Sequence, residues 1–239
     1  MFTDYVARGL VAGLVAGVAF AAFVALVGNP LVAGTEAVAG GEAMHHEAPA
    51  VAGAVAGAVS VVAGVALGLL FGAGFGAAYF FLEPVLPGGA GARSYLLGAA
   101  GFVTVSGAPW LVLPPRPAGV EAALPTDVRL AWYAGMMGLG ALVCGLAGYA
   151  YVRVDRARGT PLAVVAAALP FALLAVPVAL APANPVQGAV PDALVAAFRG
   201  VVLVGQVAVW AVLAGTHAWL CRRDVLVSAP PEVPPVSAD

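Results

Sequence analysis

The segment between residues 28 and 50 gathers the side chains best suited to binding a metal ion. It holds three glutamates and two of the chain's three histidines, and it has no basic residue. Imidazole and carboxylate together suit borderline divalent ions such as cobalt, nickel and zinc, and a segment without positive charge attracts cations. The predicted metal ligands are Glu42, His45, His46 and Glu47.

A second interpretation of this segment stays open. Adjacent residues such as His45 and His46 point in different directions in regular structure, so the two imidazoles need not bind the same ion. A polar, solvated loop that happens to contain histidines would have the same composition. The residue types alone favour neither interpretation.

Few residues in the apolar parts of the chain could handle an ion. Glu83 precedes Pro84 at the end of one apolar segment, and His217 lies near the end of the last one. Ionisable residues at membrane depth often mark transport pathways, so we predict that Glu83 and His217 belong to one. For His217 the alternative is a packed or interfacial histidine that binds nothing.

The sequence shows no catalytic arrangement. All ten basic residues are arginines, and without lysine the chain has no phosphate-binding P-loop. Ser106 lacks the flanking glycines of a nucleophile elbow, and no H-E-x-x-H motif is present. The sequence therefore predicts a protein that is not an enzyme and has no resident cofactor. A net charge of −2 argues against binding to nucleic acid.

These residues must be positioned by helices in a lipid bilayer. Of the 239 residues, 62% are hydrophobic and 9% are charged, whereas about a quarter of the residues in a soluble protein are charged. A helix needs roughly 20 apolar residues to cross the hydrocarbon core. Six segments meet this requirement, and they predict an all-α integral membrane protein with transmembrane helices at about 9–27, 54–82, 95–113, 130–152, 162–181 and 194–220.

The arginines predict the orientation of these helices. Seven of them fall on the side of the membrane that holds both termini, and three fall on the other side. Because basic residues concentrate in cytoplasmic segments, both termini are expected in the cytoplasm, with three helical hairpins that each close in an outer loop. The chain is expected to be a multi-pass protein of a prokaryotic cell membrane, with a membrane domain at 1–224 and a proline-rich cytoplasmic tail at 225–239.

Glycines and prolines predict how the helices pack and where they bend. The first helix has glycines at every fourth position from Gly9 to Gly17, and the second has a similar column from Gly64 to Gly76. Such columns allow close packing of two helices. Pro109, Pro170 and Pro177 are each expected to kink or interrupt a helix and to free a carbonyl group.

The order of these features resembles the family of predicted cobalt transporter subunits called CbtA. A glycine-rich first helix is followed by an acidic, histidine-bearing loop, and the third helix ends in a proline-rich element. The last helix has a phenylalanine-arginine pair followed by glutamine and tryptophan. The residues that carry the resemblance are Asn29-Pro30-Leu31, Leu113 to Glu121, Arg129, Phe198-Arg199, Gln206 and Trp210. Arg116 departs from the family, which tends to have uncharged polar residues there.

The resemblance implies a membrane subunit for uptake of a divalent ion, most often cobalt, beside a small single-helix partner with a histidine-bearing end. Metal capture by the segment with His45 and His46 would fit that function. Two alternatives from other classes remain open at this point. One is a structural or assembly protein that transports nothing, and the other is a permease for an uncharged small solute.

Overall fold

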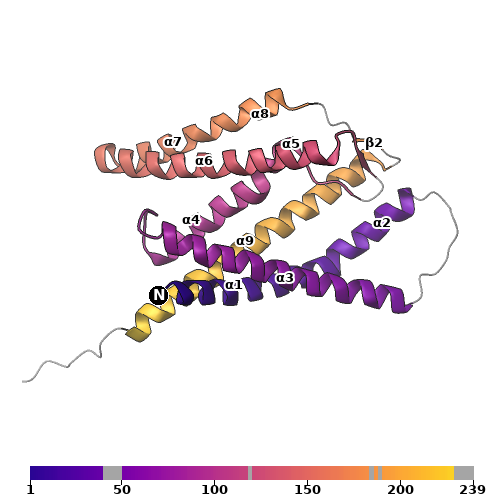
Figure 1. Ribbon diagram of the computed structural model, residues 1–239, viewed down its shortest axis with the longest axis horizontal. Helices are drawn as coiled ribbons and strands as arrows, with labels where there is room; N and C mark the ends of the chain where they lie inside the picture. Colours follow the sequence, from indigo (N-terminus) through magenta and orange to yellow (C-terminus); the bar gives the residue numbers. More distant parts are fainter. Residues whose placement is uncertain (40–49, 118–119, 183–185, 188–189, 229–239) are drawn as a thin grey trace, which may run out of the picture.

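The protein is a bundle of long helices with a short pairing of loops at one end (Figure 1). The computed structural model describes residues 1–39, 50–117, 120–182, 186–187 and 190–228. Its helical segments are α1 Phe2–Phe23, η1 Val24–Gly28, α2 Asn29–Ala39, α3 Ala50–Leu82, α4 Ala90–Phe102, η2 Val103–Gly107, α5 Ala108–Val112, α6 Thr126–Arg158, α7 Thr160–Ala168, η3 Leu169–Leu174, α8 Ala175–Leu180 and α9 Asp192–Ser228.

Six stretches of these helices are long and apolar enough to cross a membrane, which confirms the predicted number. The helices extend past the predicted apolar segments, however. α1 already begins at Phe2, and α9 continues to Ser228. Hydropathy locates the part of a helix that fits the hydrocarbon core, whereas the backbone stays helical through charged residues at its ends. The three-hairpin arrangement and the cytoplasmic termini stay predictions.

The tightest helix pair is α1 with α3, and glycine makes it possible. A Cβ atom built on Gly13 would lie 2.7 Å from the Cα of Gly72, and one on Gly9 would lie 2.8 Å from the Cα of Gly76. No side chain fits between the two backbones at these positions, because real Cβ contacts are longer than this. The predicted close packing of the first two membrane helices is confirmed.

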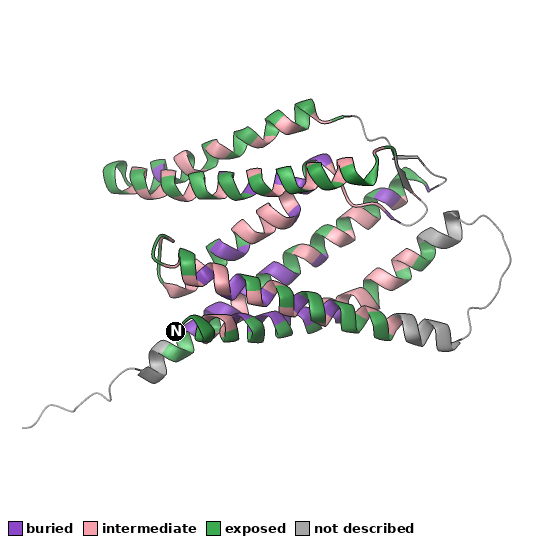
Figure 2. Ribbon diagram, in the orientation of Figure 1, coloured by how far each residue is buried: buried purple, intermediate pink, exposed green. Residues whose placement is uncertain are grey.

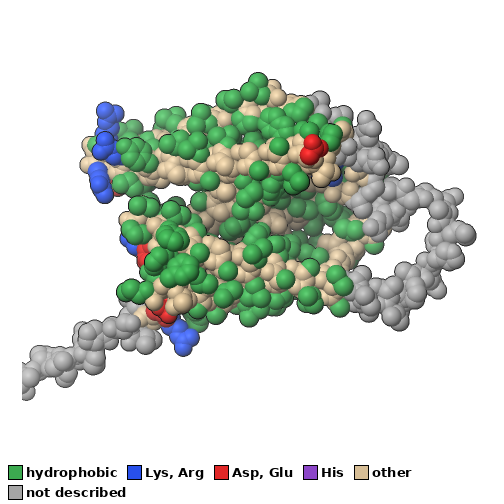
Figure 3. Space-filling view, in the orientation of Figure 1, with side chains coloured by type: hydrophobic (Ala, Val, Ile, Leu, Met, Phe, Trp, Pro, Cys, Tyr) green, Lys and Arg blue, Asp and Glu red, His purple; other side chains and the backbone are tan. Residues whose placement is uncertain are grey.

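The buried core lies where α1, α3, α4 and α9 meet (Figure 2). A smaller core lies between α5 and α6 around Met136, and α7 packs along α6. Between the ends of the bundle the surface is covered by hydrophobic side chains, and the charged side chains visible in this view lie at the ends (Figure 3). Leu70 and Leu169, each 68% exposed, belong to this apolar surface. It is the surface expected of a protein surrounded by lipid.

Prolines interrupt two of the membrane helices, as the sequence predicts. Pro109 follows the π-helical segment η2, and Pro170 lies within the 3-10 segment η3. Because Pro109 has no N–H group, the carbonyl of Val105, four residues earlier, loses its helical partner. The hydroxyl group of Tyr133 on α6 donates to that carbonyl oxygen at 2.6 Å. A neighbouring helix thus satisfies the group that the proline leaves free.

We expect Tyr133→Phe to lower the free energy of unfolding by about 1–2 kcal/mol, because the Val105 carbonyl would stay buried without a donor. The loss should shrink when Pro109 is also replaced by alanine, because alanine restores the N–H group. Unfolding of the wild type, both single variants and the double variant would test this. An equal cost of Tyr133→Phe in both backgrounds would contradict the assignment.

The two proline-rich loops pair with each other. β1 Glu121–Ala122 and β2 Val186–Gln187 form an antiparallel ladder that places Glu121 opposite Gln187. We call this end of the bundle the strand end. The opposite end, which holds the start of α1, the end of α3 and the end of α9, is called the N-terminal end (Figure 1).

Candidate functional site

The only histidine among the described residues, His217, lies in the core near the N-terminal end and is fully buried. Its Nδ1 atom is 3.0 Å from the hydroxyl oxygen of Ser94 on α4 and 3.6 Å from the Sγ atom of Cys221, one turn further along α9. The rings of Phe75 and Tyr79 pack against the imidazole, with centroids 5.1 and 4.6 Å away. We call these five residues the His217 cluster.

The hydrogen bonds of Ser94 favour one tautomer of the imidazole. The Ser94 hydroxyl donates to the backbone oxygen of Ala90 at 3.3 Å, which leaves its oxygen free to accept from His217 when the imidazole proton lies on Nδ1. In this tautomer Nε2 has a free lone pair. Nε2 is buried and has no hydrogen-bond partner among the described residues. A histidine that binds a metal ion commonly has this arrangement, with one nitrogen held by a hydrogen bond and the other free.

Charged side chains border the His217 cluster on the side of the N-terminal end. Arg8 pairs with Asp224 at 3.1 Å, and one of its Nη atoms lies 3.8 Å from the Sγ atom of Cys221. Glu83 accepts a hydrogen bond from the Tyr5 hydroxyl and lies 3.8 Å from Arg93. Glu83 is close enough to interact electrostatically with His217. Ionisable side chains are thus gathered beside the cluster at this end of the bundle.

A second polar contact lies deeper in the bundle. The hydroxyl of Ser106, in the π-helical segment η2, donates to the side-chain oxygen of Gln206 on α9 at 3.3 Å. Both residues lie on membrane-spanning helices, where a polar side chain without a partner is costly. The contact places two polar side chains, hydrogen-bonded to each other, in the interior between the His217 cluster and the strand end.

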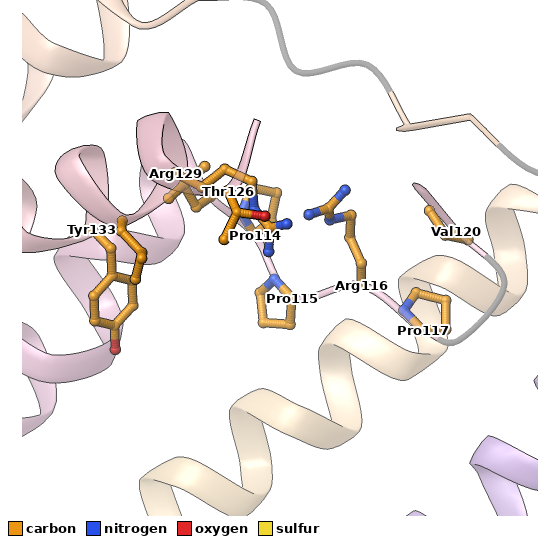
Figure 4. Close-up of a pocket in the computed structure, with 10 residues that line it drawn as sticks. Pro114, Pro115, Arg116, Pro117, Val120, Thr126, Arg129 and Tyr133 are labelled. Carbon is orange, nitrogen blue, oxygen red and sulfur yellow. The ribbon is translucent and has the colours of Figure 1, made fainter. Parts of the chain in front are cut away.

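A cavity of about 490 Å³ opens at the strand end, lined by the proline-rich segment after α5 and by the first turns of α6. Arg116 and Arg129 project into it from these two elements (Figure 4). Burial, followed by the nearby charges of Arg129 and Arg199, lowers the pKa of Arg116 from its ordinary value. We call this cavity the arginine pocket.

The residues that the sequence predicts to handle an ion lie in two parts of the chain. Glu83, which directly follows the end of α3, lies close enough to His217 on α9 to interact with it electrostatically. Glu42, His45, His46 and Glu47 fall outside the described residues, so their role as ligands stays a prediction. Within the described part of the chain, no group of three or more His, Cys, Asp or Glu side chains is arranged to hold a metal ion.

The sequence singles out His217 but none of its neighbours in the cluster. Cys221 lies four residues after His217, a spacing that puts both on one helix face. Ser94 comes from α4, which is far away in the sequence, and no local pattern marks it. Its position depends on how α4 packs against α9, which only the fold reveals.

Comparison with known proteins identifies a family. No curated protein and no solved structure matches the chain. The family described as "Probable cobalt transporter subunit (CbtA)" matches residues 2–222. This range covers the six stretches that are long and apolar enough to cross a membrane, except for the last two residues of the sixth. Because the match covers nearly the whole chain, the protein belongs to the CbtA family of probable cobalt transporter subunits.

Proposed function

We propose that this protein is a membrane subunit for the uptake of cobalt in a prokaryotic cell membrane, and that it is not an enzyme. The family supports a cobalt transporter subunit, and the six apolar helices support a multi-pass membrane protein. The observation that carries the proposal further is the free Nε2 atom of His217, which is buried in a bundle that has few other polar groups.

His217 offers a ligand of the kind that cobalt prefers. Imidazole nitrogen and thiolate both bind borderline first-row ions, and Cys221 lies beside the imidazole. A transported ion must be bound tightly enough to enter but weakly enough to leave. One or two ligands from this chain would bind the ion weakly enough for it to be released. Glu83 provides a further carboxylate toward the N-terminal end.

Capture of the ion is assigned to the segment that contains Glu42, His45, His46 and Glu47. This segment connects α2 to α3, and by the arginine distribution it lies on the outer side of the membrane. An acidic, histidine-bearing segment there would raise the local concentration of Co²⁺. A small partner subunit with a histidine-bearing end would supply further ligands. No nucleotide-binding motif is present in the sequence, so we assign the driving energy to an ion gradient or to the partner.

We expect replacement of both His45 and His46 by alanine to reduce accumulation of radiolabelled cobalt at low external concentration, because the imidazoles that collect the ion are lost. The reduction should fade at high cobalt concentration, where capture no longer limits entry. Thr35→Ala, in α2 just before this connection and without a metal ligand, is the control. Unchanged uptake by the double variant at every concentration would remove this segment from the mechanism.

A further inference from the structure

The arginine pocket presents more positive charge than the described residues neutralise. Arg116 and Arg129 line it, and their guanidinium groups lie near one another (Figure 4). Arg199 lies behind its wall, where Nε donates to the backbone oxygen of Pro115 at 3.2 Å. The ion pairs found among the described residues involve Arg8, Arg93 and the amino terminus, and none involves these three arginines.

One guanidinium nitrogen in the pocket lacks a hydrogen-bond partner among the described residues. The Nη1 atom of Arg116 is buried and makes no hydrogen bond to any described residue. A buried N–H group without an acceptor costs free energy, and the cost is larger for a charged group. Like charges from Arg129 and Arg199 add repulsion to this cost. A hydrogen-bond acceptor with negative charge would lower both the cost of the unpaired N–H group and the repulsion between the arginines.

The backbone adds further donors. Thr126, which lines the pocket, begins the 33-residue helix α6, and no side chain caps this helix end. The first N–H groups of a helix have no partner within the helix, and they bear partial positive charge. The pocket therefore combines guanidinium groups with a helix amino terminus, and its volume of about 490 Å³ exceeds what a small oxyanion needs.

We propose that the arginine pocket binds an oxyanion that carries two negative charges, such as a phosphate group, through Arg116, Arg129 and the amino terminus of α6. Arg199 positions the proline-rich wall through its bond to Pro115. The phosphate group comes either from solution or from the headgroup of an anionic lipid, because the pocket lies at an end of the bundle where both are within reach (Figure 1). This proposal does not depend on cobalt transport.

Thermal unfolding of the purified full chain in detergent tests the proposal, with inorganic phosphate as the probe and chloride at equal ionic strength as the reference. We expect phosphate to raise the melting temperature above the chloride value, because a ligand that binds only the folded state stabilises it. Arg116→Gln and Arg129→Gln should each weaken the apparent affinity about tenfold, since each removes a charge-assisted hydrogen bond.

Two control variants make the result specific. Arg153→Gln removes an exposed arginine from the other end of α6 and should leave the phosphate response unchanged. Glu121→Gln removes a negative charge from the loop after the pocket and should retain or strengthen the response. The proposal is overturned if phosphate stabilises the wild type no better than chloride does, even if the Glu121→Gln variant responds to phosphate.

Lipid composition then distinguishes the two sources of the phosphate group. The titration is repeated in nanodiscs made either of phosphatidylglycerol or of a galactolipid, which has no phosphate. If the headgroup occupies the pocket, added phosphate should stabilise the protein only in galactolipid. If the anion comes from solution, both nanodiscs should show the stabilisation. Absence of stabilisation in both, and in detergent, would contradict the proposal.

Discussion

Gly72→Ala is expected to destabilise the protein by roughly 3 kcal/mol, at the upper end of the usual cost of overpacking. The new methyl group would lie 2.7 Å from the Cα atom of Gly13 on α1. The neighbour is backbone, so no rotamer change can relieve the clash, and α1 and α3 would have to separate. Thermal unfolding in detergent would measure the loss, at roughly 2–4 °C of melting temperature per kcal/mol for a chain of this size.

Gly74→Ala is the matched control for that experiment. Gly74 lies two residues away on the same helix, is exposed, and has no atom within 4 Å of the position of a new Cβ. Alanine has a higher helix propensity than glycine, so this variant should be neutral or more stable by up to about 1 kcal/mol. Equal destabilisation by Gly72→Ala and Gly74→Ala would mean that α1 and α3 do not pack through their glycines.

His217→Asn should reduce cobalt uptake at least tenfold, by analogy with the loss expected when a metal site is damaged, while the protein still folds. The amide nitrogen of asparagine is as far along the side chain as Nδ1, so the bond to Ser94 can persist. Nε2, the free ligand, is lost. Ser94→Ala should cause a smaller reduction, because the imidazole remains but its tautomer is no longer fixed.

Uptake of radiolabelled cobalt and melting temperature should be measured on the same preparations of these variants. Cys144→Ala serves as the control, because Cys144 lies outside the His217 cluster, with its thiol 3.9 Å from the backbone oxygen of Ala100. Wild-type uptake by a folded His217→Asn variant would show that Nε2 has no part in transport, and that His217 is the packed histidine considered as the alternative.

Most of the fold follows from simple sequence patterns. Apolar length alone identifies the six membrane helices, because the hydrocarbon core imposes a minimum span. The glycine columns of α1 and α3 also identify their contact, since only glycine permits it. Helix ends are less predictable. α1 passes through Asp4 and Arg8 without interruption, because charged side chains at the membrane boundary do not break a helix.

The candidate site is less predictable than the fold. The sequence pointed to Glu83 and His217, because ionisable residues in apolar segments are rare. It could not identify Ser94 as the partner of His217, since the two residues are 123 positions apart and meet only when α4 packs on α9. The convergence of Arg116, Arg129 and Arg199 has the same cause. They come from three separate segments that the fold brings together at the strand end.

Cobalt accumulation in the native host tests the central proposal most directly. Cells that lack this chain would be compared with cells that regain it, at limiting external cobalt, with radiolabelled cobalt as the tracer. We expect deletion to lower cobalt accumulation and the wild-type chain to restore it, whereas a stably folded His217→Asn variant should not restore it. Equal cobalt accumulation with and without the chain, when its partner is present, would contradict a role in cobalt uptake.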